Sequence, residues 1–175
     1  LVFLQGLGIT PAYANRIIAR YSDVAAAEVV RRNPYRLASE IEGIGFLTAD
    51  RIAAQLGIEK NSPLRLCAGV VHTLEELANR GNVCCPKVLL IPEVARILEV
   101  PESAAELGLD TALAENKVNA VSFADPDLAS PFIYLRRLKQ AEEELAEAVN
   151  LLLNSPLPPV SVPWQRLGND YLRLN

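Results

Sequence analysis

Three consecutive residues, Gly43-Ile44-Gly45, have the composition of an anion-binding turn. A chain that reverses between two helices in so few residues needs a positive φ, which glycine adopts at little cost. The helix that follows begins with backbone N–H groups that lack partners within the helix, and this end carries a partial positive charge. We therefore predict that the turn binds a phosphate through main-chain atoms, in a way that does not depend on base sequence. Ile44 is expected to point inward and to anchor the turn.

The pattern around these glycines occurs twice. The segment from Gly8 to Ile17 lines up with the segment from Gly43 to Ile52, an offset of 35 residues (Gly8 to Gly43). The pattern of each copy predicts a helix, a tight turn and a second helix. A further helix, predicted at residues 24–32, links the two copies. Thr10 replaces the second glycine in the first copy. The first hairpin is therefore either a DNA contact or only a structural partner of the second.

The elements after residue 60 follow another order. Helices are predicted at 63–80, near 92–98 and near 102–115, an extended piece at 83–85, and strands at 117–123 and 132–135. Helix, strand, helix, helix and hairpin is the order of a winged helix. The fold class expected is mainly α: a tandem helix-hairpin-helix domain, then a winged-helix-like α+β domain, then a long C-terminal helix. The expected boundaries are 1–60 for the first domain, 61–135 for the second, 136–153 for an amphipathic connecting helix, and 154–175 for a Pro-rich linker and tail.

Charge is distributed unevenly along the chain. The net charge of −4 argues against a wholly basic nucleic-acid-binding surface. Residues 1–65 hold eight Arg and Lys against six acids, and the remaining residues hold nine against fifteen. A phosphate contact is therefore expected in the first third of the chain.

Two segments resemble a known family. Asn33-Pro34-Tyr35-Arg36-Leu37, followed at short range by Gly43-Ile44-Gly45-Phe46, resembles the region before the motor of RecD-like ATP-dependent DNA helicases, which are relatives of the exodeoxyribonuclease V alpha subunit. The resemblance runs over about residues 1–153 and includes the helix-hairpin-helix motif of DNA repair and recombination proteins. It implies contact with the DNA backbone, often with a monovalent cation at the turn. The DNA-binding residues that it implies are Gly43, Ile44, Gly45, Phe46, Leu47, Thr48 and Arg51 in the second hairpin, and Gly8, Ile9, Thr10 and Arg16 in the first.

A motor is not encoded in these residues. The sequence contains no G-x-x-x-x-G-K-[ST] pattern, so this chain is not expected to bind ATP in the usual way or to be an enzyme. The resemblance implies a 5′-to-3′ helicase as the parent protein, with ATP and magnesium as cofactors of the missing motor. The chain starts at Leu1 and has no Met, so we expect a piece of a longer protein. The partners expected are DNA and the helicase's own motor domain. The chain has no membrane-length apolar run and no secretory signal, and we expect it to be cytoplasmic.

Two other function classes compete with this hypothesis. A protein-interaction scaffold that docks the motor or a repair partner would account for the acidic second half better than DNA binding does. A hydrolytic enzyme lacks a plausible catalytic set, because His72 is the sole histidine and Cys67, Cys84 and Cys85 are expected to be small buried thiols. No metal site is expected, and the run Glu142-Glu143-Glu144 is interpreted as a solvated helix face.

Overall fold

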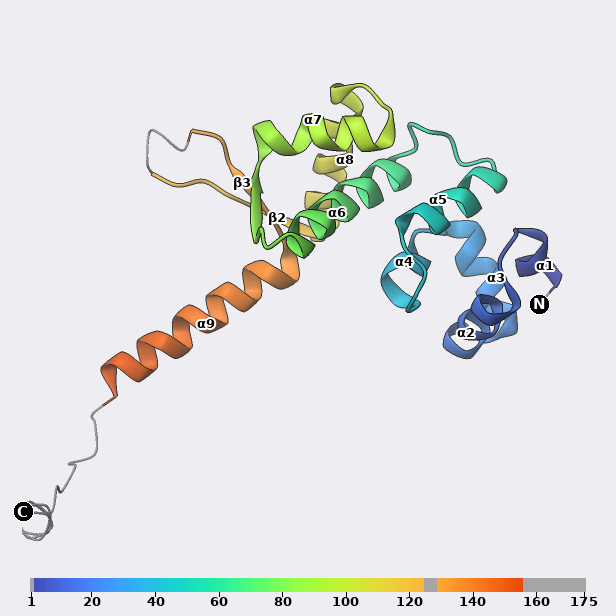
Figure 1. Ribbon diagram of the computed structural model, residues 1–175, viewed down its shortest axis with the longest axis horizontal. Helices are drawn as coiled ribbons and strands as arrows, with labels where there is room; N and C mark the ends of the chain where they lie inside the picture. Colours follow the sequence, from blue (N-terminus) through green and yellow to red (C-terminus); the bar gives the residue numbers. More distant parts are fainter. Residues whose placement is uncertain (1, 125–128, 156–175) are drawn as a thin grey trace, which may run out of the picture. The chain divides into compact units, whose positions relative to one another are not determined.

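The computed structural model describes residues 2–124 and 129–155 of the chain (Figure 1). These residues are mainly helical, with one small antiparallel sheet. This agrees with the expectation of a mainly α fold. The chain divides into two compact units, Leu1–Gln140 and Ala141–Asn175.

The first five helices of the first unit surround one apolar cluster. Its fully or almost fully buried side chains include Leu4, Ile17, Val30, Leu37 and Ile52. Each of them comes from a different helix, so the cluster ties both sequence copies together. The helices are α1 (Val2–Gly6), α2 (Pro11–Tyr21), α3 (Asp23–Arg32), α4 (Arg36–Glu40) and α5 (Phe46–Gln55).

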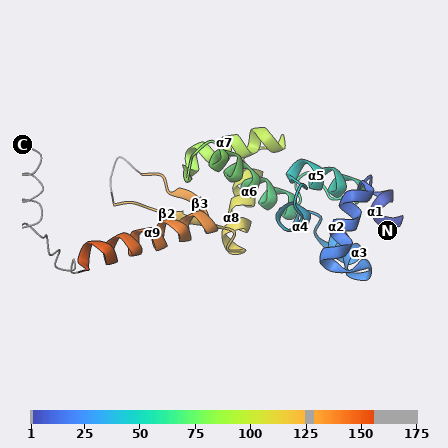
Figure 2. The same ribbon diagram turned by 60° about the horizontal axis from the view of Figure 1, so that its bottom comes forward.

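A second apolar cluster joins α5 to the rest of the first unit. In both views α6, α7 and α8 lie against one another (Figures 1 and 2). A Cβ atom at Gly108 on α8 would lie 2.8 Å from the backbone of Leu66, so only glycine allows α8 to approach α6 this closely. The elements are α6 (Pro63–Asn79), β1 (Cys84–Pro86), α7 (Lys87–Leu98), α8 (Glu102–Ala114), β2 (Val118–Val121) and β3 (Phe132–Leu135).

The sheet has the order β1-β3-β2, with both pairings antiparallel. Cys85 lies opposite Ile133 in one pairing, and Ala120 lies opposite Ile133 in the other. Ile133 is 1% exposed, so the middle strand turns an apolar side chain into the core. The predicted strand at 132–135 is confirmed, and the one predicted at 117–123 is shorter than expected.

The prediction that a helix starts near Pro92 is wrong. The helix α7 begins at Lys87, and Pro92 lies inside it. Leu90 and Ile91 are buried in the core, and this burial holds the earlier turn helical despite the missing N–H of the proline. Pro92 itself is exposed.

Helix α9 (Arg136–Asn154) follows β3 directly, as predicted within one residue. Its residues up to Gln140 belong to the first unit and the rest to the second. No side chain of α9 is buried, and Leu145, Leu151, Leu152 and Leu153 are all more than half exposed. The linker and tail predicted at 154–175 lie outside the described part of the chain from residue 156 onward. Every helix in the described ranges is too short or too polar to cross a bilayer.

Candidate phosphate-binding hairpin

The second turn connects α4 to α5 through Glu42, Gly43 and Ile44. The N–H of Ile44 donates to the carbonyl of Ile41 at 3.1 Å, which closes a four-residue turn with Gly43 at its third position. Gly43 has a φ of +87°, the conformation that this position requires in a type II turn. Ile44 is 3% exposed, which confirms that it points inward and anchors the turn.

Gly45 differs from the sequence-based expectation. The positive φ that the turn was expected to need falls on Gly43 and not on Gly45, because the turn places its third residue in the left-handed region. Gly45 has φ −93° and ψ 176°, an extended conformation that other residues can adopt, and it is the N-cap of α5. Apart from its two chain neighbours, no atom of the described residues lies within 4 Å of a Cβ built on it. Gly45 is therefore not needed for the fold of the turn, and its small size leaves the start of α5 open.

The first turn of α5 presents unpaired donors. The N–H groups of Thr48 and Ala49 both donate to the carbonyl of Gly45 at 3.1 Å. Within residues 2–124 and 129–155, no acceptor receives the N–H of Gly45, Phe46 or Leu47. These donors lie at the positive end of the α5 dipole, where an oxyanion is stabilised. The arrangement suits one phosphate group.

The first hairpin has a different turn. The N–H of Ile9 donates to the Leu4 carbonyl at 3.2 Å, and the N–H of Gly8 donates to the Gln5 carbonyl at 3.0 Å. With Gly8 at φ +64°, these two bonds form a Schellman motif. The two sequence copies therefore reverse the chain through different hydrogen bonds.

The start of α2 presents fewer donors than the start of α5. Pro11 has no N–H, and the N–H of Tyr13 donates to the Thr10 hydroxyl at 3.4 Å. Among the described residues, only Thr10 and Ala12 keep unpaired N–H groups there. The second hairpin is therefore the better candidate phosphate site of the two.

The two predicted arginine helpers lie in different surroundings. Arg51 is exposed on α5 and donates to the Thr48 hydroxyl at 3.5 Å. No carboxylate in the described part of the chain pairs with it. Arg16 instead donates from Nη1 to the backbone carbonyl of Glu42, in the second turn, at 2.8 Å. Arg51 thus stays available beside the hairpin, whereas Arg16 is engaged within the fold.

Other arginines of the first third have partners of their own. Arg36 Nε lies 2.7 Å from Glu40 Oε1, and Arg20 Nη2 lies 3.7 Å from Glu40 Oε2. The hydrogen bond from Arg36 holds the pKa of Glu40 below its usual value. Burial, followed by the nearby Glu40 carboxylate, raises the pKa of Tyr21 to about 12. This cluster compensates its own charge, so it is a weaker phosphate site than the hairpin.

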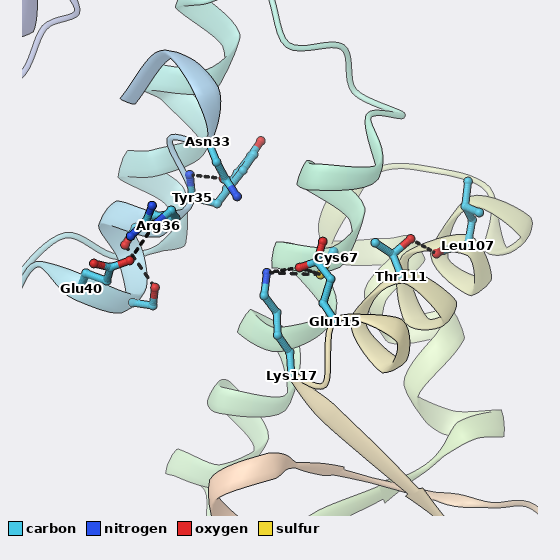
Figure 3. A network of polar contacts seen from close by, with 10 residues as sticks. Asn33, Tyr35, Arg36, Glu40, Cys67, Leu107, Thr111, Glu115 and Lys117 are labelled. Atoms are coloured by element: carbon cyan, nitrogen blue, oxygen red, sulfur yellow. Dashed lines mark hydrogen bonds and ion pairs between the residues drawn. The ribbon is translucent and has the colours of Figure 1, made fainter. Parts of the chain in front are cut away.

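A cleft of about 840 Å³ opens beside the hairpin, within the first unit. Figure 3 shows polar groups on two of its walls, with Arg36 and Glu40 on one and Glu115 and Lys117 on the other. Lys117 Nζ lies 2.7 Å from Glu115 Oε2 and 3.6 Å from the buried thiol of Cys67. Burial raises the pKa of the Cys67 thiol, so it stays protonated and is a poor nucleophile. These cations already have carboxylate partners, which makes the cleft a weak anion site.

An aromatic stack positions α5 on α6. The rings of Tyr35 and Phe46 lie 5.8 Å apart, and those of Phe46 and His72 lie 4.8 Å apart, in both cases nearly parallel. The Tyr35 hydroxyl donates to Asp50 at 2.7 Å, and Arg65 also binds Asp50. The sequence analysis identified Tyr35 and Phe46 as part of a family pattern but missed their contact. Their spacing alone carried no signal of it.

Groups that could bind a metal ion do not gather in the described residues: no three His, Cys, Asp or Glu side chains have suitable geometry there. Cys67, Cys84 and Cys85 are free thiols.

Comparison with known proteins finds matches over the first half and over nearly the whole chain. Residues 1–84 match the family model of the ATP-dependent RecD2 DNA helicase HHH domain. The chain is 30% identical to an ATP-dependent RecD2 DNA helicase of Deinococcus radiodurans over 97% of its length. That alignment covers 24% of the relative, so this chain spans about a quarter of the relative's length. Both turns and both candidate phosphate sites lie within residues 1–84.

Proposed function

Residues 1–84 belong to the helix-hairpin-helix domains of RecD2-type DNA helicases, and from this premise we propose that the chain binds the DNA backbone and positions DNA for a motor without catalysing a reaction itself. The observation that carries the proposal is the first turn of α5, where the N–H groups of Gly45, Phe46 and Leu47 have no acceptor among the described residues. Contacts of this kind read phosphate and not base sequence.

The finer architecture is part of the same proposal. Residues 1–60 would form a tandem helix-hairpin-helix domain, and residues 61–135 a winged-helix-like domain. The order of α6, β1, α7, α8, β2 and β3 supports the second assignment. The parent protein would be a cytoplasmic 5′-to-3′ helicase whose motor uses ATP and magnesium. Its motor domain would be the protein partner of this chain.

The proposal is tested by binding of the whole chain to single-stranded, duplex and forked DNA of unrelated sequences. Fluorescence anisotropy at about 50 mM and about 200 mM salt gives the salt dependence, which is steep when phosphate contacts carry the affinity. We expect binding that weakens strongly at the higher salt and varies little with sequence. Absence of binding at the lower salt, or affinity indifferent to salt, would refute the proposal.

A protein-interaction scaffold is the second candidate. It is favoured by α8, whose exposed Glu102, Glu106 and Asp110 would repel DNA. This candidate becomes the better one if the chain fails to bind DNA in the titration above. Neither candidate predicts DNA-stimulated ATP turnover by this chain, since it has no P-loop sequence.

A further inference from the structure

The cleft beside the second hairpin shares two residues with the proposed phosphate site. Gly45 and Phe46, whose N–H groups have no acceptor among the described residues, also line the cleft of about 840 Å³. All of its described lining residues belong to the first unit. A nucleoside is joined covalently to its phosphate, so a phosphate held at the start of α5 brings a sugar and a base to this cleft.

The charges of the cleft are balanced. Among the described residues that line it, four are Arg or Lys and four are Glu. Three of these cations lie within 4.0 Å of a carboxylate, in the pairs Arg36 with Glu40, Lys117 with Glu115 and Arg137 with Glu75. Figure 3 shows two of these pairs on opposite walls. A polar lining without excess positive charge suits a neutral ligand group better than a second phosphate.

An aromatic stack reaches the cleft at His72. Its ring lies 4.8 Å from that of Phe46, with 12° between the two planes, and Phe46 in turn stacks on Tyr35. Phe46 and Tyr35 are buried, whereas His72 is only partly buried and lines both this cleft and a smaller cavity next to α7. The stack therefore has an accessible end at His72.

Amide side chains supply the polar part of the same lining. An amide group offers both hydrogen-bond donors and an acceptor, as the edge of a nucleobase does. The amide residues that line the cleft are Asn33, Asn79, Asn116 and Gln140. A planar ring surface with amide groups around it matches a planar, uncharged ligand with donors and acceptors on its edge.

We propose that the cleft binds one unpaired nucleobase, next to a phosphate held by the second hairpin, with His72 as a stacking surface. Every base has a flat face, so stacking of this kind tolerates any sequence. In a duplex the faces and pairing edges of a base are covered by other bases, and the base must leave the stack to enter a protein pocket. The substrate class is therefore DNA with unpaired nucleotides. This inference rests on the proposed DNA binding by the same hairpin.

The test compares two single strands of equal length in the anisotropy assay at the lower salt concentration. One is a native strand, and the other is built entirely from abasic units, so the two carry the same phosphates and differ in their bases. The parent chain should bind the native strand about tenfold more tightly, which is the effect of about one stacked base. This comparison requires no variant.

Two replacements of His72 separate the planar ring from the space that it fills. His72→Phe keeps a planar ring beside Phe46 and should keep the preference for the native strand. His72→Leu has no planar face, so it should bind the native strand about tenfold more weakly than the parent does, with unchanged affinity for the abasic strand. Circular dichroism checks that both variants are folded.

The outcomes distinguish this inference from the proposed function. Equal binding of the two strands by the parent, or binding to duplex DNA alone, would overturn the inference while the proposed function stands. A chain that binds neither strand nor duplex DNA would refute the proposed function and the inference together. A folded His72→Leu variant with the full preference for the native strand would also overturn the inference, because the base would then stack elsewhere.

Discussion

Arg65 donates two hydrogen bonds to the carboxylate of Asp50, from Nε at 2.9 Å and from Nη2 at 3.0 Å. Its Nη1 donates to the carbonyls of Lys60 and Leu98, each at 3.1 Å. The Arg65 side chain is 12% exposed, so water competes weakly for these bonds. The guanidinium of Arg65, near the start of α6, therefore connects α6 with α5, with the segment after α5 and with the end of α7.

Removing the carboxylate should weaken the fold substantially. Asp50→Ala leaves a largely buried guanidinium without its counter-charge, and we expect a loss of about 3 kcal/mol in the free energy of unfolding, measured by urea denaturation. Glu99→Gln is the control, because Glu99 forms an exposed pair with Lys60 at 3.7 Å. Such exposed pairs contribute less than about 1 kcal/mol. Equal losses in the two variants would show that the Asp50 pair has no special role.

Ionisation of the Tyr35 hydroxyl should destabilise the fold at alkaline pH. Burial, and then the hydrogen bond to Asp50, raises the pKa of Tyr35 far above its usual value. The stability from this raised pKa is fully present below the unfolded value of about 10 and is lost as the pH rises above it. Tyr35→Phe should therefore be less stable than the parent at neutral pH, and this difference should shrink above about pH 10. Thermal melts across that range check it; a constant difference would contradict the assignment.

Ser22 has a backbone conformation that only glycine adopts easily. It lies between α2 and α3 with φ 70° and ψ 162°, and in the described structure its hydroxyl does not cap α3. Ser22→Gly should relieve this strain and stabilise the chain by about 1 kcal/mol. Ser62→Gly is the matched control, because Ser62 precedes α6 with an ordinary φ of −59° and also lacks a cap bond. A melting temperature that falls in Ser22→Gly would exclude strain at this position.

The helices could be predicted from the sequence because their signals are local. Thr10-Pro11 and Gly57 mark helix ends, and the structure places a capped helix start and a positive-φ glycine there. The inward position of Ile44 followed from the turn alone. The hydrogen bonds from Tyr13 and Arg16 to the second turn could not be predicted in this way. They join residues 30 and 26 positions apart, and that proximity depends on how α2 packs.

The extended conformation of Gly45 makes a clean binding test available. Gly45→Val should fold, at a cost of about 1 kcal/mol for the poorer helix cap. Its branched side chain would cover the open N–H groups, so DNA affinity should fall by about tenfold for every sequence tested. Thr10→Val at the matching position of the first hairpin replaces only the capping hydroxyl by a methyl group, and it should affect DNA affinity less. Circular dichroism must show both variants folded; a folded Gly45→Val with parental affinity would exclude the second hairpin as the phosphate site.

Helix α8 should not contact DNA. Glu106 and Asp110 are exposed, and Glu106 Oε1 lies 3.8 Å from Lys87 Nζ. A surface with these charges repels phosphate, so we expect it to face protein. Reversing both charges, with Glu106→Lys and Asp110→Lys, should leave the DNA dissociation constant nearly unchanged in the anisotropy assay. A several-fold change of affinity in either direction would place α8 at the DNA.

The difference between the two turns has a consequence for strand direction. Two equivalent phosphate sites would fix two points on a DNA strand and so define its heading, whereas one site fixes a single point. Pro11 and the Thr10 cap remove donors from the first hairpin, so the second hairpin would hold the strand as a pivot. A strand held at a pivot can leave in more than one direction. We therefore expect the motor of the proposed parent helicase, rather than this hairpin, to set its translocation polarity.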